Sequence, residues 1–197
     1  MARRVSSPPI TTPYLHLAST VLPRKRAVTI ALVVSFALLT AAAAQFRISL
    51  PFTPVPITGQ TFAVLLAGGV LGSRAGAASQ ALYWMAGLVF PFYSGGESGW
   101  TVATGATGGY LAGFIVAAWA VGTLAERGQD RTVASAIPAF LAGTVVIYLF
   151  GVPWLAHELG VSWQRAVELG VVPFVIGDLV KVAMAGLLLP GAWSLKR

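Results

Sequence analysis

Long apolar runs are the feature of this sequence that most restricts its fold. Hydropathy marks six of them, at residues 27–46, 57–71, 75–90, 106–125, 133–151 and 171–189. A helix that spans a bilayer needs about 20 mainly apolar residues. The chain is 56% hydrophobic and 10% charged, whereas about a quarter of the residues of a soluble domain are charged. We therefore predict an all-α integral membrane protein with six transmembrane helices.

The second and third runs are short for straight spans. Gly72, Ser73 and Arg74 separate them, and this break predicts a tight helical hairpin. A single broken element is the alternative.

The distribution of lysine and arginine predicts the orientation, because cytoplasmic loops carry an excess of both. With six spans and the N-terminus inside, the cytoplasmic side holds Arg3, Arg4, Arg24, Lys25, Arg26, Arg74, Arg127, Arg131, Lys196 and Arg197. The outer side holds Arg47 and Arg165, and Lys181 lies within a span. Both termini are therefore predicted to be cytoplasmic, in a multi-pass protein of the plasma (inner) membrane.

Three parts of the chain are expected. Residues 1–26 form a basic, proline-containing arm, and the apolar run after it is too long for the core of a signal peptide, which has about 7–15 residues. Residues 27–190 form one membrane domain that binds the substrate and contacts lipid. Residues 191–197 form a cytoplasmic tail.

Net charge and composition exclude several classes of function. The charge of +7 follows from loop orientation, so we expect no nucleic-acid partner. The absence of cysteine and the presence of two histidines argue against disulfides, thiolate catalysis and a metal centre. No cofactor is predicted.

Small residues recur at four-residue spacing in several of the runs. They are Ala27 and Ala31, Ala37 and Ala41, the trio Gly68, Gly72 and Gly76, and the pair Gly109 and Gly113. Such faces let helices approach closely in lipid, and internal packing is the preferred interpretation. Docking onto a separate membrane subunit is the alternative, which we expect at Ala27, Ala31, Ala37 and Ala41.

Residues 154–168 join the last two runs and mix tryptophans with charged residues. We interpret them as an amphipathic segment at the membrane interface, in which Ser162 caps a short helix that starts at Trp163. A lid over an outer site is the alternative.

The last run contains Asp178 and Lys181. Each charge costs roughly 2.5–3.5 kcal/mol at the centre of a membrane helix. At a spacing of three residues the two side chains lie on the same helix face and can form a pair. A charged residue inside a membrane indicates a functional site, and the lysine offers a point charge for a ligand carboxylate.

Other polar and aromatic residues are predicted to gather at the same outer end. Polar candidates for the substrate site are Thr58, Gln60, Thr107, Tyr110 and Tyr148. Trp100 and Tyr83 are candidates for flat apolar walls. Gln60 carries one acceptor and two donors, which suits an amide or a urea. The Gly-rich loop of residues 91–105 either folds over the ligand or serves as a connector.

Four motifs in order resemble the BioY family of biotin transporters over residues 27–189. They are Pro54-Val55-Pro56-Ile57-Thr58-Gly59-Gln60-Thr61, then Thr107-Gly108-Gly109-Tyr110-Leu111-Ala112-Gly113-Phe114, then Ile147-Tyr148 with Gly151, and finally Pro173-Phe174 with Gly177-Asp178 and Lys181. Ala106 stands where the family usually has proline, which leaves the backbone before the fourth run less restricted. Gly59 is unusually small for its motif, and we interpret it as tolerated variation.

The resemblance implies a substrate-capture subunit of an energy-coupling-factor (ECF) transporter. Biotin would bind near the outer face, its carboxylate at Lys181 and its ureido ring at Asp178, Gln60 or Tyr148. ATP would be hydrolysed by two separate ATPase subunits joined through a membrane coupling subunit, and this chain contains no phosphate-binding G-x-x-x-x-G-K-[ST] motif.

Three alternatives remain. The chain could capture another carboxylated vitamin, or it could transport alone. The string Gly96-Glu97-Ser98-Gly99 also fits an intramembrane serine protease, but that chemistry needs a histidine base near the serine, and His16 and His157 both lie outside the predicted spans.

Overall fold

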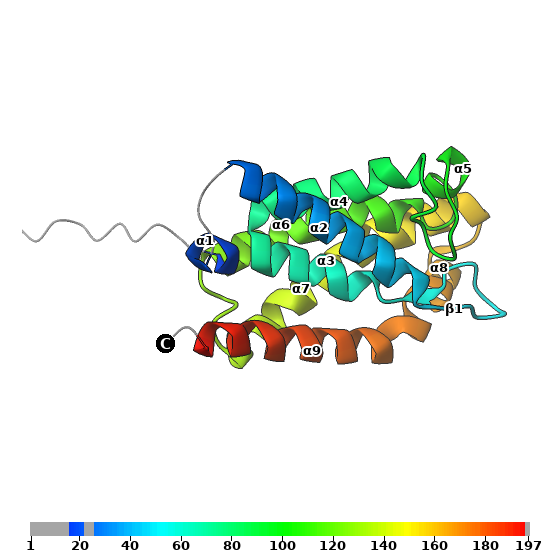
Figure 1. The fold of residues 1–197 in the computed structure, drawn as a ribbon. Coiled ribbons are helices and arrows are strands. Elements are labelled where there is room, and N and C mark those ends of the chain that lie inside the picture. The colour runs from blue at the N-terminus through cyan, green and yellow to red at the C-terminus, as the bar shows by residue number, and fades with distance from the viewer. Residues whose placement is uncertain (1–15, 22–25, 196–197) are drawn as a thin grey trace, which may run out of the picture.

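The computed structural model describes residues 16–21 and 26–195, so most of the predicted basic arm and the last two residues lie outside the described part. The long helices run side by side in one bundle (Figure 1). The helices are α1 (Leu17–Val21), α2 (Arg26–Gln45), α3 (Gln60–Leu71), α4 (Ser73–Gly87), α5 (Trp100–Ala103), α6 (Gly108–Glu126), α7 (Val133–Leu159), α8 (Trp163–Gly170), the 3-10 helix η1 (Val172–Phe174) and α9 (Val175–Ser194).

Each of the six predicted apolar runs overlaps one of the long helices, namely α2, α3, α4, α6, α7 and α9. Four stretches are long and apolar enough to cross a membrane: Arg26–Gln45, Gly108–Glu126, Val133–Leu159 and Trp163–Ser194. With 12 and 15 residues, α3 and α4 extend for roughly 18 and 23 Å, which is less than the hydrocarbon core of about 30 Å. The chain is thus an all-helical, multi-pass membrane protein.

Helix α6 is the centre of the bundle, where it packs against α3, α4 and α7. Of the four candidate spans it is the most buried. Glycines allow this close packing: a Cβ atom on Gly68 would lie 2.6 Å from the carbonyl oxygen of Ala118, and one on Gly113 would lie 3.1 Å from the Cα atom of Ile147. These small residues therefore pack helices of the same chain against each other.

A tight turn at Gly72 joins α3 to α4, as the sequence predicts. Gly72 has a φ of 79°, a conformation that favours glycine. Ser73 begins α4, and its backbone N–H and its hydroxyl both donate to Glu126 Oε1, at 2.7 and 2.8 Å. Glu126 thus satisfies helix-end donors of α4 and ties the hairpin to the end of α6.

Residues 154–168 differ from the prediction in their first half. Helix α7 continues through Pro138 and Pro153 and ends at Leu159, so Trp154 belongs to this long helix and not to a separate segment. Proline is tolerated in membrane helices because neighbouring groups compensate the lost hydrogen bond. The second half is as predicted: Ser162 accepts from the backbone N–H of Arg165 and caps α8, which starts at Trp163.

The end of the bundle that holds α1 and the last turn of α9 is closed by polar contacts. Asp130 follows α6 and is 1% exposed, and it accepts a hydrogen bond of 2.6 Å from Trp193 Nε1. The guanidinium of Arg131 lies 5.2 Å from the centre of the Trp193 ring. Burial raises the pKa of Asp130, and the hydrogen bond from Trp193 partly offsets that effect.

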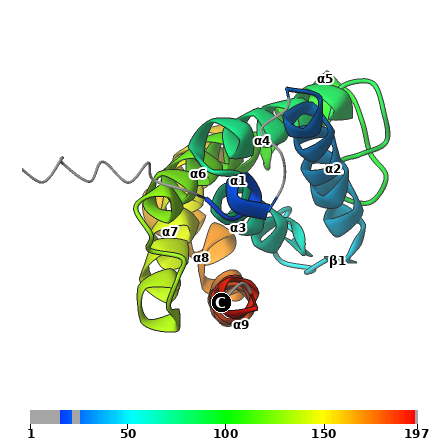
Figure 2. The same cartoon turned by 60° about the vertical axis from the view of Figure 1, so that its left-hand side comes forward.

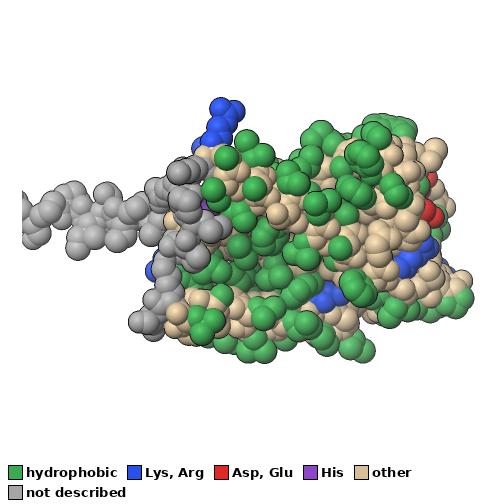
Figure 3. Space-filling view, in the orientation of Figure 1, with side chains coloured by type: hydrophobic (Ala, Val, Ile, Leu, Met, Phe, Trp, Pro, Cys, Tyr) green, Lys and Arg blue, Asp and Glu red, His purple; other side chains and the backbone are tan. Residues whose placement is uncertain are grey.

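The opposite end carries β1 (Arg47–Ile48), β2 (Ile57–Thr58), α5 and α8 (Figure 1). The two strands pair antiparallel, Arg47 opposite Thr58, an element that the all-helical prediction does not contain. Viewed nearly along the bundle, α2 and α9 lie on either side of α3 (Figure 2). Their outer faces are apolar, with Ile30 at 55%, Ile176 at 80% and Leu187 at 61% exposure, and hydrophobic side chains cover much of this side of the molecule (Figure 3).

Candidate functional site

A cavity of about 230 Å³ lies at the end that carries β1 and α5. This equals the volume of about eight water molecules, so a small organic molecule fits better than a single ion. Eight of the nine predicted substrate residues line it: Thr58, Gln60, Tyr83, Thr107, Tyr110, Tyr148, Asp178 and Lys181. Trp100 does not, because α5 leaves it 64% exposed. Ala106, where the family usually has proline, is also part of the wall.

Asp178 and Lys181 pair within the first turns of α9. Lys181 Nζ donates to Asp178 Oδ1 at 2.8 Å, and the side chains of Lys181 and Asp178 are 15% and 9% exposed. The Tyr148 hydroxyl of α7 donates to the other carboxylate oxygen. Each Asp178 oxygen therefore already accepts one hydrogen bond and keeps lone pairs for further N–H donors.

Gln60, the first residue of α3, also lines the cavity. The Thr58 hydroxyl donates to Gln60 Oε1 at 2.8 Å, and Gln60 Nε2 donates to the Tyr83 hydroxyl oxygen at 2.7 Å. Gln60 and Tyr83 are 6% and 1% exposed. The preceding residue, Gly59, donates its backbone N–H to the Ala43 carbonyl at 3.1 Å. A Cβ there would lie 3.0 Å from that oxygen, so Gly59 lies in close contact with α2.

Tyr110 has a different role from the other cavity tyrosines. Its hydroxyl donates to the carbonyl of Gly170 at 2.9 Å, and its ring meets that of Tyr148 edge to face at 6.5 Å. The hydroxyl is therefore engaged in holding the end of α8, and the ring faces the cavity. The Thr107 hydroxyl, in contrast, makes no hydrogen bond to other described residues.

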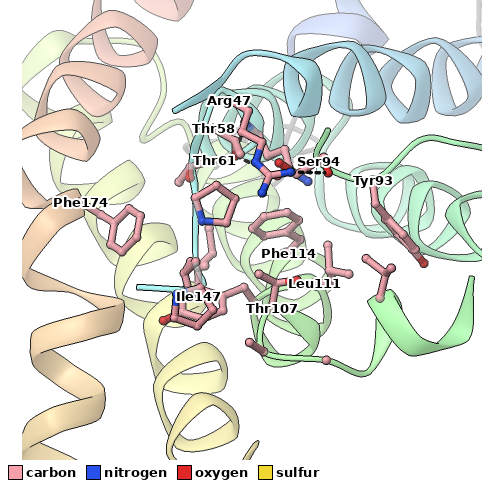
Figure 4. A pocket seen from close by; sticks show the side chains of 18 of the residues that line it. Arg47, Thr58, Thr61, Tyr93, Ser94, Thr107, Leu111, Phe114, Ile147 and Phe174 are labelled. Carbon is pink, nitrogen blue, oxygen red and sulfur yellow. Dashed lines mark hydrogen bonds between the residues drawn. The ribbon is translucent and has the colours of Figure 1, made fainter. Parts of the chain in front are cut away.

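Arg47 lines the cavity but is absent from the sequence-based site (Figure 4). Its Nε donates to the Ser49 hydroxyl at 3.0 Å and its Nη1 to the Ser94 carbonyl at 3.4 Å. Within residues 16–21 and 26–195 no carboxylate forms an ion pair with it. The pairing of Arg47 with Thr58 brings this guanidinium to the rim. Hydropathy gives no signal for such a short ladder.

The loop between α4 and α5 adds Tyr93, Ser94 and Glu97 to the wall. Tyr93 is 2% exposed, and its hydroxyl donates to the carbonyl of Trp84 at 2.6 Å. Burial raises the pKa of Tyr93 to about 12. The Gly-rich loop of residues 91–105 thus forms part of the cavity wall, and the buried Tyr93 fixes it to α4.

The bundle and its cavity define a class of protein: a multi-pass α-helical membrane protein with a small-molecule site at one end, where cationic, carboxylate and neutral polar groups meet. The chain belongs to the BioY family, whose model matches residues 15–197.

Relatives agree with this assignment. The chain is 38% identical over 149 residues to the biotin transporter BioY of Rhizobium etli, covering 72% of this chain and 79% of that protein. It is 40% identical over 157 residues to the probable biotin transporter BioY of Pyrococcus horikoshii, covering 79% and 90%. The fold is similar to the crystal structure of the S-component for biotin from an ECF-type ABC transporter, with a TM-score of 0.77, 21% identity, and coverage of 89% and 94%.

The family is one of transporters and not of enzymes. The sequence Gly96-Glu97-Ser98-Gly99 lies in the loop between α4 and α5. Ser98 makes no hydrogen bond to a histidine within the described residues, and His16 contacts the Val70 carbonyl at the opposite end of the bundle.

The four alanines predicted to dock a partner do not form one exposed face. Ala37 and Ala41 are each 5% exposed and belong to the core of this chain. Ala27 and Ala31 are exposed. A partner could therefore reach the first half of the predicted face and not the second.

Proposed function

We propose that this chain binds biotin in the cavity and acts as the substrate-capture subunit of an ATP-driven ECF transporter. The observation that carries the proposal is that residues of all four family motifs, among them Asp178 and Lys181 of the fourth, line one cavity. Biotin offers a carboxylate and a ureido ring with N–H donors and a carbonyl, which match the cationic and acceptor groups of the wall. The names of the relatives support the same ligand.

Calorimetric titration of the purified protein with biotin and desthiobiotin tests this proposal. We expect biotin to bind with measurable heat and to raise the unfolding temperature, since a ligand that binds the native state stabilises it. Absence of both effects would refute biotin as the ligand. Binding of another carboxylated vitamin in the same assay would favour the alternative substrate.

Two cations can receive the carboxylate, and we propose Arg47. Lys181 is already compensated by Asp178 at 2.8 Å, whereas Arg47 donates to neutral oxygens. A guanidinium can also hold a carboxylate through two parallel hydrogen bonds. Asp178 would then accept from the ureido N–H groups.

Ligands that differ at the carboxylate test the assignment. Arg47→Gln should weaken the binding of biotin more than that of biotin methyl ester. If Lys181→Met has this selective effect and Arg47→Gln does not, the carboxylate lies at Lys181, the position implied by the family resemblance.

We also propose six membrane spans with both termini in the cytoplasm, and the cavity on the outer side. The chain has no cysteine, so single cysteines can be introduced without background. A membrane-impermeant maleimide should label Glu97→Cys in intact cells and should label Arg127→Cys after lysis. The opposite pattern would invert the topology.

A membrane coupling subunit and two ATPase subunits are the proposed partners. The exposed small residues Ala27 and Ala31 are the proposed docking positions, because small residues let helices approach closely in lipid. Ala31→Trp should reduce co-purification with the coupling subunit and leave biotin binding unchanged. Unchanged co-purification would place the docking face elsewhere.

A further inference from the structure

The hydrogen bonds around Gln60 run in one direction and end at the cavity. The backbone N–H of Gln60 donates to Thr58 Oγ1 at 3.3 Å, and the Thr58 hydroxyl donates to Gln60 Oε1 at 2.8 Å. Gln60 Nε2 then donates to the hydroxyl oxygen of Tyr83 at 2.7 Å. Each group in this series donates to the next, and the series ends at the Tyr83 hydroxyl.

The orientation of the Gln60 amide follows from Thr58. The Thr58 oxygen already accepts from the Gln60 backbone, so its own proton needs an acceptor, which the amide oxygen of Gln60 supplies. The opposite orientation would exchange the two hydroxyl groups: Gln60 Oε1 would accept the Tyr83 proton, and the Thr58 proton would have no acceptor among the described residues. In the orientation that the structure has, the NH₂ group faces Tyr83.

Tyr83 has a proton to donate. The phenol is neutral at physiological pH, because the ordinary pKa of tyrosine is about 10, and its oxygen already receives the Gln60 N–H. No other described residue accepts the Tyr83 proton. Tyr83 is 1% exposed and lines the cavity, and a buried hydroxyl without an acceptor is costly.

The neighbouring tyrosine behaves differently. Tyr93 meets the Tyr83 ring edge to face at 6.0 Å, but its proton is committed to the Trp84 carbonyl at 2.6 Å. The hydroxyl proton of Tyr83 is therefore available to a ligand, whereas that of Tyr93 is not.

We propose that Tyr83 selects the ligand by donating its hydroxyl proton to a ligand oxygen, and that Thr58 and Gln60 are positioning residues that fix the direction of this donor. The inference rests on the proposed function, since biotin carries two kinds of acceptor oxygen, in the ureido carbonyl and in the carboxylate. Asp178, which lines the same cavity, presents acceptors. The wall thus offers both a donor and acceptors to a urea-like group, which has N–H donors and a carbonyl.

Three ligands and two variants test the direction of this series of hydrogen bonds. In 2-iminobiotin an N–H group replaces the ureido oxygen, and biotin methyl ester lacks the free carboxylate. Tyr83→Phe should weaken the binding of biotin about tenfold, the effect of one neutral hydrogen bond. The affinity for the ligand that lacks the accepting oxygen should change by no more than about twofold. An unchanged 2-iminobiotin affinity identifies the ureido oxygen, and an unchanged methyl ester affinity identifies the carboxylate.

Gln60→Glu reverses the series, because a carboxylate accepts the Tyr83 proton and turns the Tyr83 lone pairs toward the ligand. If the ureido oxygen is the acceptor, this variant should lower the ratio of biotin affinity to 2-iminobiotin affinity further than Tyr83→Phe does. If the carboxylate is the acceptor, it should instead lower the ratio of biotin affinity to biotin methyl ester affinity further than Tyr83→Phe does. Tyr93→Phe is the matched control and should change the affinities for all three ligands by the same factor. Equal losses for all three ligands in Tyr83→Phe, or no loss, would overturn the proposal.

A measurement without ligand separates this inference from the identity of the substrate. In protein with ¹⁵N-labelled glutamine, the Gln60 side-chain N–H signal, assigned with a Gln60→Glu sample, should move upfield in Tyr83→Phe, which removes its acceptor. An unmoved signal would refute the hydrogen-bond direction, even if biotin binds. A moved signal in a protein that binds no biotin would refute the substrate and support the donor.

Discussion

The buried pair of Asp178 and Lys181 offers the sharpest test of how charge is tolerated in this bundle. Exposed ion pairs contribute about 0–1 kcal/mol, whereas removal of one partner from a buried pair costs about 3–5 kcal/mol. With the Asp178 and Lys181 side chains 9% and 15% exposed, this pair belongs to the buried class. The partial exposure of Lys181 places the expected cost near the lower limit, at roughly 3 kcal/mol.

Three variants form a double-mutant cycle. Asp178→Asn leaves Lys181 without its counter-charge, and Lys181→Met leaves the carboxylate with Tyr148 alone, so each should lose roughly 3 kcal/mol of unfolding free energy. The double variant buries no charge, and its loss should be about 1 kcal/mol, well below the sum of the two single losses. In the Asp178→Asn variants the new amide oxygen can still accept from the Tyr148 hydroxyl, which keeps this second contact in the cycle.

The assay is reversible unfolding in mixed detergent micelles, followed by circular dichroism at constant pH. Biotin titration of the same samples gives the second readout. We expect the double variant to be folded and unable to bind biotin, which would assign the pair to ligand binding and not to folding. Additive losses in the double variant would refute the reasoning, because they would mean that the two charges do not compensate each other.

Three further predictions concern other parts of the molecule. Gly68→Leu should destabilise the bundle by about 3 kcal/mol or more, because its Cβ would lie 2.6 Å from the Ala118 carbonyl oxygen. Thermal unfolding checks this, with Gly177→Leu as control, since a Cβ on Gly177 would meet no atom within 4 Å. Burial raises the pKa of Asp130, so the native state binds this proton more tightly than the unfolded state. Stability should therefore fall as pH rises from the ordinary value of 3.8 through the native pKa, and Asp130→Asn should flatten this part of the pH profile. Trp100→Ala should leave biotin affinity within about twofold in calorimetry, since an exposed side chain outside the cavity adds little to binding; a loss of about tenfold would mean that α5 folds over the ligand.

Hydropathy was sufficient to place the helices, because lipid requires long apolar segments whose backbone hydrogen bonds are all internal. It failed at the boundary of α7. Pro153 and the charged residues beyond it suggested an end near residue 151, but the helix continues to Leu159. There the Trp154 indole donates to the carbonyl of Gly105 at 2.9 Å, a tertiary contact that compensates for an unfavourable local sequence.

The site was predictable where function needs an unusual residue in a helix, as at Asp178, Lys181 and Gln60. Arg47 was missed because an arginine in an outer loop is the ordinary case for a membrane protein, and its pairing with Thr58 depends on two strands of two residues each. Tyr93 was missed because a loop rich in glycine and serine gives no sign that one tyrosine is buried. Trp100 was expected in the site but does not line the cavity. Aromatic character alone does not indicate which way a four-residue helix faces.

The length of α7 sets the depth of the site in the membrane. Its 27 residues extend for about 40 Å at 1.5 Å per residue, roughly 10 Å more than the hydrocarbon core. If Val133 marks one boundary of the core, the other falls about 20 residues later, near Pro153, and Trp154 lies at headgroup level. Tyr148 is then about 7 Å below that surface. A charged ligand held there is shielded from lipid by the protein wall alone, so release toward either side depends on which parts of that wall can separate.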